Sequence, residues 1–201
     1  MADKPSEIYE EWDRLAFPYE PVVSKEREAG LRALYARCLP GGVWKVGIEE
    51  AALVSRRIEY IGYQTCDFNE VIQVLETLFA HPDAPQLERY EYYLSCLGVS
   101  YFLAGDTANA VDRLKRARQM IGGDSRKAES RLITPFMYIN DLLKPRLKIP
   151  LEIREIASSV VASWPRCKRR SKQILQAGTR GAFHRLLEEA RVAAWCSRRR
   201  V

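Results

Sequence analysis

The chain has 201 residues, of which 47% are hydrophobic, and its formal net charge is +6 at pH 7. This length and composition predict one folded domain, or one domain with an appendage, and exclude collagen-like and wholly disordered chains. No window approaches 18 uncharged apolar residues, and the acidic N-terminus lacks the basic and apolar regions of a signal peptide. We therefore expect a soluble, cytoplasmic protein with no integral membrane segment.

The positive charge is gathered at one end of the chain. Residues 166–201 contain eleven Lys or Arg and two acids, a net charge of +9, whereas residues 1–165 carry −3. A split of this kind is typical of a mildly acidic body that carries a basic interaction tail.

The cysteines are scattered, odd in number, and never spaced as CxxC or placed beside a histidine. They are Cys38, Cys66, Cys96, Cys167 and Cys196. This pattern argues against a disulfide framework and against a zinc site, so we expect reduced and mostly buried thiols.

Helical periodicity dominates the sequence, and no segment shows convincing strand alternation. We expect an all-α protein of about seven to nine helices. Eight candidate helices, in chain order, are 6–16, 24–39, 46–65, 67–80, 86–104, 107–121, 124–143 and 151–164. Weaker candidates for two short basic helices follow at 166–177 and 179–197.

Local signals mark several of these boundaries. Ser24 is a typical N-cap for the second helix. Asp67 is expected to cap a later helix, with Glu70 as its reciprocal partner in a capping box. Gly105 is expected to end one helix and Asp106 to cap the next.

One of these helix pairs carries a repeat motif. Its residues are Leu97, Gly98, Tyr101, Ala110 and Leu114. Their offsets resemble those of a tetratricopeptide repeat (TPR) spanning about 91–124. Gly98 and Ala110 are small, which predicts that two antiparallel helices cross closely there, and Tyr101 and Leu114 fill the space beside them.

A weaker copy of this repeat precedes it, at about 52–85. Laying Asp67 on Asp106 places Ile58, Val71 and Leu75 on Leu97, Ala110 and Leu114. Most of the small residues are missing from this copy, so its helices are expected to cross differently. The resemblance covers about half of the chain, and the alternative is a generic helical bundle of the same fold class.

These features divide the chain into four parts. They are an N-terminal extension (1–23), a TPR-like helical body (24–145), an amphipathic capping helix (146–165) and a basic C-terminal tail (166–201). The expected fold is an all-α, TPR-like array or bundle of antiparallel helical hairpins with a basic helical tail.

The resemblance implies a binding groove, because in this family the first helix of each repeat lines a concave surface that binds a peptide or another helix. Carried over position by position, the groove residues are Arg56, Tyr60, Tyr63, Tyr92, Ser95, Val99 and Phe102. An aromatic and apolar lining favours an amphipathic helix or a hydrophobic peptide as the ligand. The alternative is that the protein's own terminal helices cover these residues, with 151–164 as a candidate lid.

The densest basic clusters lie in the tail. Their residues are Arg166, Lys168, Arg169, Arg170, Lys172, Arg198, Arg199 and Arg200. Such clusters fit an import receptor, which implies a nuclear location, or contact with the phosphate backbone of a nucleic acid without base specificity. The alternative is a solvated terminus.

The sequence holds no recognisable motif for catalysis, metal binding or cofactor binding. Its two histidines, His81 and His184, neighbour no nucleophile motif, and there is no phosphate-binding glycine loop, HExxH or GxSxG. The adjacent acids Glu49 and Glu50 would point apart on a helix. We therefore expect no enzyme and no cofactor, with a small helical enzyme lacking a known signature as the alternative.

Two hypotheses about function follow. The first is a non-enzymatic TPR-like adaptor that binds a hydrophobic or amphipathic helical peptide of a partner protein in the aromatic-lined groove. The second is a nucleic-acid-associated or nuclear protein that uses its basic tail, with the helical body serving for assembly or self-association.

Overall fold

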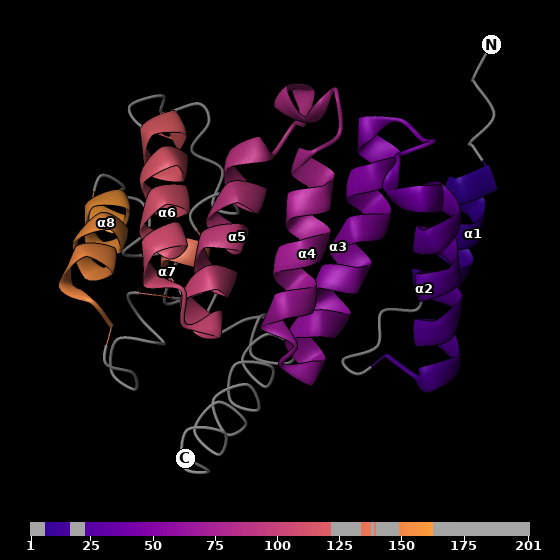
Figure 1. Cartoon of the computed structure of the whole chain (residues 1–201), viewed down its shortest axis with the longest axis horizontal. Helices are drawn as coiled ribbons and strands as arrows, with labels where there is room; N and C mark the ends of the chain where they lie inside the picture. Colours follow the sequence, from indigo (N-terminus) through magenta and orange to yellow (C-terminus); the bar gives the residue numbers. More distant parts are fainter. Residues whose placement is uncertain (1–6, 17–22, 122–133, 138, 140–148, 163–201) are drawn as a thin grey trace. The chain divides into compact units, whose positions relative to one another are not determined.

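The computed structural model describes residues 7–16, 23–121, 134–137, 139 and 149–162 (Figure 1). Its helices are α1 (Glu7–Ala16), α2 (Lys25–Cys38), α3 (Ile48–Thr65), α4 (Phe68–Phe79), α5 (Tyr90–Ala104), α6 (Thr107–Ile121), α7 (Thr134–Met137) and α8 (Leu151–Ala162), with 3-10 turns at Pro40–Gly42 and Ala84–Gln86. These residues contain helices and no strand, which confirms the all-α fold class. Most of the predicted helix 124–143 and the whole tail 166–201 lie outside the described residues.

The described helices fall into two compact units. The first unit holds α1 to α4 and the second holds α5 to α8. In the first unit α1, from the predicted N-terminal extension 1–23, packs against both α2 and α3. The four-part division of the chain itself stays a prediction.

The α3–α4 hairpin of the first unit turns at Asp67, as the sequence predicts. The Asp67 carboxylate accepts a hydrogen bond from the backbone N–H of Glu70 at 2.9 Å, which caps α4. The prediction that the Glu70 side chain is the reciprocal partner of Asp67 in a capping box is wrong. The backbone N–H of Asp67 donates instead to the carbonyl oxygen of Gly62 at 2.8 Å, which closes the end of α3.

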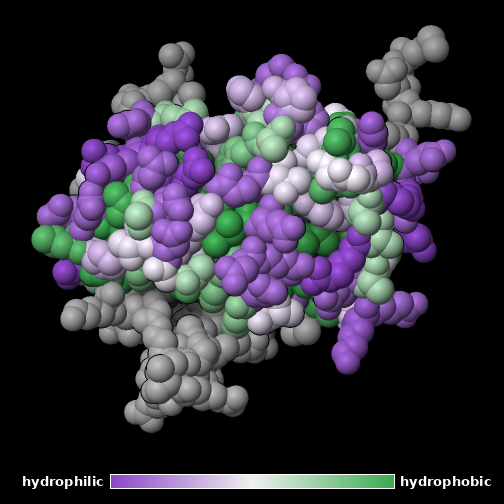
Figure 2. All heavy atoms as spheres, in the orientation of Figure 1, coloured by the Kyte–Doolittle hydropathy of each residue, from purple (hydrophilic) through white to green (hydrophobic). Residues whose placement is uncertain are grey.

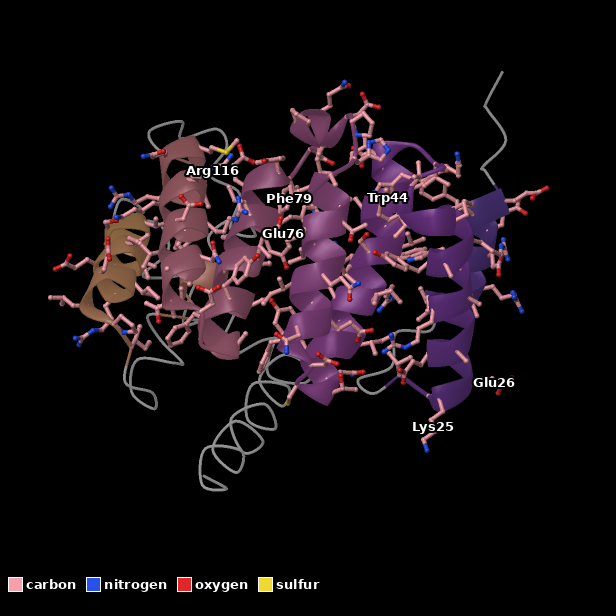
Figure 3. The ribbon with its side chains drawn as sticks, viewed as in Figure 1. Lys25, Glu26, Trp44, Glu76, Phe79 and Arg116 are labelled. Carbon is pink, nitrogen blue, oxygen red and sulfur yellow. The ribbon has the colours of Figure 1, made fainter. Side chains whose placement is uncertain are left out.

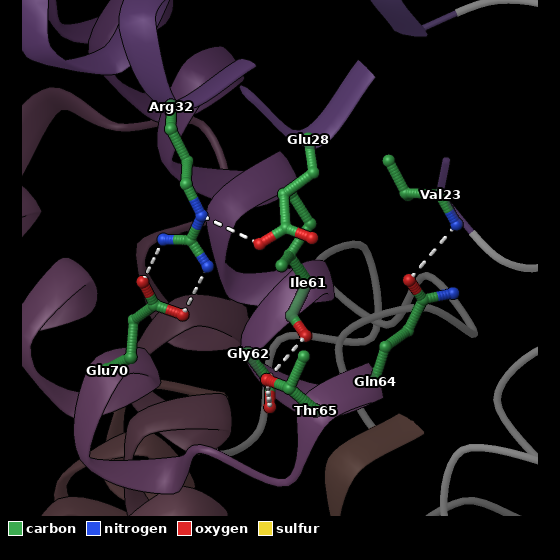
Figure 4. A network of polar contacts seen from close by, with 8 residues as sticks. All are labelled: Val23, Glu28, Arg32, Ile61, Gly62, Gln64, Thr65 and Glu70. Atoms are coloured by element: carbon green, nitrogen blue, oxygen red, sulfur yellow. Dashed lines mark hydrogen bonds and ion pairs between the residues drawn. The ribbon is translucent and has the colours of Figure 1, made fainter. Parts of the chain in front are cut away.

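The Glu70 carboxylate is occupied by Arg32 of α2 (Figure 4). Two guanidinium nitrogens of Arg32 bind its two oxygens, and a third donates to Glu28 at 2.8 Å. These charge-assisted bonds raise the pKa of Arg32 above its ordinary value, chiefly through Glu70. A paired, bidentate bond to arginine is stronger than a bond to one neutral N–H, which explains why Glu70 leaves the capping box.

The α5–α6 hairpin of the second unit has the predicted turn. Gly105 has a φ of 95°, a left-handed conformation that costs glycine little, and it ends α5. The carboxylate of Asp106 then accepts from the backbone N–H of Asn109 at 3.1 Å and caps α6. Both local signals are confirmed.

The close helix crossing at Gly98 is confirmed as well. A Cβ atom on Gly98 would lie 2.7 Å from Cγ and 3.2 Å from the backbone nitrogen of Leu114. In the α3–α4 hairpin the tight contact is instead between Gly62 and the Val71 side chain, where a Cβ would lie at 2.6 Å. The weaker copy of the repeat therefore does cross differently, with its glycine nearer the turn.

Helix α8 confirms the predicted amphipathic helix over 151–164, although the structure describes it only to Ala162. Its inner face is buried, and it packs against α6 and α7. The buried residues are Ile153, Ile156, Ala157 and Val160. At its edge Glu152 pairs with Lys115, and the hydroxyl of Ser159 accepts from Arg118 at 3.3 Å, so both polar links reach α6.

Candidate functional site

On α3 the predicted groove residues differ in accessibility. Arg56 is exposed, Tyr60 is half-buried and Tyr63 is buried. The ring of Tyr63 packs edge-on against Phe68 at the start of α4, with 6.3 Å between centroids. Tyr63 therefore belongs to the packing between α3 and α4, while Arg56 and Tyr60 remain accessible on α3.

On α5 most of the predicted groove residues are buried. Tyr92 is half-buried, but Ser95 has no exposed surface, and Val99 and Phe102 are 7% and 9% exposed. The Ser95 hydroxyl donates to the carbonyl oxygen of Tyr92 at 2.8 Å, a bond within the helix. On α5 the accessible part of the predicted groove is thus reduced to Tyr92.

The cover over α5 differs from the lid expected from the sequence. The proposed lid 151–164 is α8, which packs against α6 and α7. The short helix α7 packs against α5, and its Phe136 is fully buried. Burial of the predicted groove residues on α5 fits the self-covering alternative, but the helix predicted to be the lid packs against α6 and α7.

Helix α1 packs on a surface that was not predicted from the sequence. The apolar side of α1 consists of Ile8, Trp12 and Leu15, all partly buried. It rests on a fully buried cluster formed by Leu34, Cys38 and Val54. Leu15 fits against Gly30 of α2, where a Cβ atom would lie 2.7 Å from its Cδ2.

Two arginines hold the polar side of α1. Arg37 of α2 binds both carboxylate oxygens of Glu11, at 3.1 and 2.7 Å. Arg57 of α3 donates to the carbonyl oxygen of Ala16, at the end of α1, at 2.9 Å. The same guanidinium lies 5.6 Å from the centroid of the Trp12 ring, within the range of a cation–π contact.

We call this surface of α2 and α3 the α1 seat. Its residues are Gly30, Leu34, Arg37, Cys38, Val54 and Arg57. The sequence predicts the helix over 6–16, but the surface on which it packs combines two other helices and cannot be predicted from local spacing.

His81 is a structural residue of the first unit. Its Nδ1 accepts from the backbone N–H of Asp83 at 3.0 Å, so the proton is on Nε2, which donates to the carbonyl oxygen of Val46 at 3.0 Å. Trp44, labelled in Figure 3, lies beside it and donates from Nε1 to the carbonyl oxygen of Thr77 at 2.8 Å. Both histidine nitrogens are therefore engaged in holding the segment after α2 against the end of α4.

The described cysteines are not in disulfides. Cys38 and Cys96 are buried, and Cys66 is partly buried at the end of α3. Burial raises the pKa of the Cys38 thiol, which disfavours the reactive thiolate. Within the described ranges no group of three His, Cys, Asp or Glu side chains is placed to hold a metal ion.

The face shown in Figure 2 mixes hydrophilic and hydrophobic side chains. In the described part of the chain the exposed large hydrophobic residues are Tyr9, Val43, Met120 and Leu151. None of the helices in that part is long and apolar enough to cross a membrane.

In comparisons with known proteins, no family model, curated protein or solved structure matches the chain. The TPR resemblance accordingly stays a prediction.

Proposed function

We propose that the protein is a non-enzymatic, TPR-like adaptor that binds an amphipathic or hydrophobic helix of a partner protein. The observation that carries this proposal is the contact between α1 and the α1 seat. There a ten-residue helix lays three apolar side chains, Ile8, Trp12 and Leu15, across two neighbouring helices. This is the helix-in-groove mode of recognition, with anchors at i, i+4 and i+7.

Three of the predicted groove residues remain accessible and provide candidate contacts for a partner protein. Arg56 and Tyr60 on α3, and Tyr92 on α5, keep exposed surface and combine aromatic rings with a charge. Tyrosine and arginine are the residue types that most often anchor protein interfaces. The proposed contacts are therefore Arg56 and Tyr60 in the first unit and Tyr92 in the second, each considered by itself.

Photo-cross-linking tests this assignment. A benzophenone amino acid is placed at Tyr60 or Tyr92 of the full-length chain, and in matched controls at Gln73 of α4 or Gln119 of α6, which are exposed. We expect one protein adduct in cells from the first two positions and none from the controls. Equal labelling from all four positions, or none from Tyr60 and Tyr92, would reject the groove.

The second candidate function, nucleic-acid or import-receptor binding, is carried by charge. Residues 88–165 carry +3 and the tail 166–201 carries +9, against −6 for residues 1–87. The basic residues proposed for contact, Arg166–Lys172 and Arg198–Arg200, lie outside the described residues. This candidate also includes a nuclear location and self-association through the helical body.

A salt titration tests the nucleic-acid candidate. If five or six of the basic tail residues engage phosphates, log K against log salt should have a slope of about −4 to −5. Changing Lys168, Arg169 and Arg170 to Ala should flatten that slope by about two to three units. Labelled DNA and RNA titrated at several salt concentrations measure this, and weak binding that ignores the triple change would favour a solvated terminus.

A further inference from the structure

Helix α1 is held less firmly than the other long helices of its unit. It has ten residues, fewer than the roughly 12–15 that an isolated helix needs to be even marginally stable, so docking must supply its stability. Of its side chains only Ala16 is fully buried, whereas α2, α3 and α4 each bury several.

The seat beneath α1 is also held together by contacts that do not involve α1. Leu34, Cys38 and Val54 cluster with one another and also touch Tyr35, Trp44 and Val46, which do not belong to α1. Nearby, Leu31 packs with Ile58, Ile61 and Val74. The two helices that carry the seat are thus joined by their own core, and removing α1 would uncover the seat without removing its support.

The seat also specifies the chemistry of its occupant. It accepts large apolar side chains at the positions of Ile8, Trp12 and Leu15, the last against the notch at Gly30. Two cations, Arg37 and Arg57, flank it, and α1 meets them with a carboxylate, an aromatic face and its C-terminal carbonyl group. These features suit an acidic amphipathic helix, because the C-terminal end of a helix and its carboxylates are negative.

We propose that the α1 seat is an exchangeable helix-binding site and that α1 is its resident, autoinhibitory occupant. The external ligand is an acidic amphipathic helix of a partner protein, with large apolar residues at i, i+4 and i+7 and a carboxylate at i+3. The inference rests on the proposed helix-binding function. Cross-linking from Tyr60 and Tyr92 reports on the groove alone, whereas the assay below reports on the seat alone, so the two proposals can fail separately.

The test uses a fluorescent peptide of residues 6–17 as the probe and full-length protein, with fluorescence anisotropy as the readout. In the released variant, Trp12→Ser and Leu15→Ser detach α1 and leave the seat untouched. A tethered helix competes at an effective concentration of about 1 mM, so its release should tighten probe binding about tenfold or more. Adding Gly30→Leu to the released variant closes the notch and should abolish binding.

A matched pair of mild changes keeps the test valid if the released variant unfolds. Glu11→Gln in the chain weakens the resident helix and leaves Arg37 free for the probe, so binding should tighten by about twofold. Arg37→Ala removes the same ion pair but also removes a contact of the probe, so it should give no gain. A gain from changing Glu11 and no gain from changing Arg37 are not expected if their ion pair is merely structural.

Three results would overturn the proposal. The first is a folded released variant that does not bind the probe, and the second is equal binding to the wild-type and released chains. The third is a wild-type dimer, measured by light scattering, that the probe dissociates, because this would assign the seat to α1 of a second copy.

Discussion

Gly98→Leu is expected to destabilise the protein by about 1–3 kcal/mol, because it overpacks the closest contact between α5 and α6. A Cβ atom added at this position would lie 3.2 Å from the backbone nitrogen of Leu114, and backbone cannot swing aside as the end of a side chain can. Thermal unfolding followed by circular dichroism measures the effect, at about 2–4 °C of midpoint per kcal/mol for a chain of this size.

Gly47 provides the control for this substitution. A Cβ there would meet nothing within 4 Å, and its backbone is extended at φ −68°, so Gly47→Leu should cost less than about 1 kcal/mol. Equal midpoints for the two variants would mean that the α5–α6 crossing is looser than the structure places it.

Leu114→Ala is expected to destabilise the protein by about 2–5 kcal/mol. Leu114 is completely buried in α6, and truncating it leaves a cavity beside Gly98. Urea unfolding of the purified variant measures the loss, with the slope of the transition checked for two-state behaviour.

The double variant Gly98→Leu, Leu114→Ala tests whether the two residues share one space. The new leucine on α5 can occupy the volume that the lost leucine on α6 vacates. The double variant should therefore be at least about 0.5 kcal/mol more stable than the sum of the single effects predicts. Strict additivity would contradict direct contact between the two positions.

The sequence predicts best those features of the fold that depend on residues close together in the chain. Helix α6 runs from Thr107 to Ile121 as expected, because Gly105 and Asp106 act on the neighbouring backbone. Helix α5 begins at Tyr90 instead of 86, since Ala84–Gln86 forms a separate 3-10 turn. The sequence shows a break at such a place but not how the chain turns through it.

The features that could not be predicted depend on residues far apart in the chain. The Glu70 carboxylate binds Arg32, which is 38 residues away, instead of completing the predicted capping box. Ser95 and Val99 are buried, although the repeat pattern predicts that they line an accessible groove. The α1 seat joins Gly30 and Val54 from two helices, and no periodicity within one helix shows which surfaces meet.

The central claim is that the protein binds an amphipathic helix of a partner protein. It is tested most directly by mapping, with mass spectrometry, the partner residues cross-linked from Tyr60 and Tyr92, and then placing proline in that partner segment. The account predicts cross-linked residues at i, i+3 or i+4 and i+7 spacing, and loss of binding with proline, because proline breaks a helix at a cost of about 3 kcal/mol. Cross-links at alternate residues of an extended segment, with binding that tolerates proline, would contradict it.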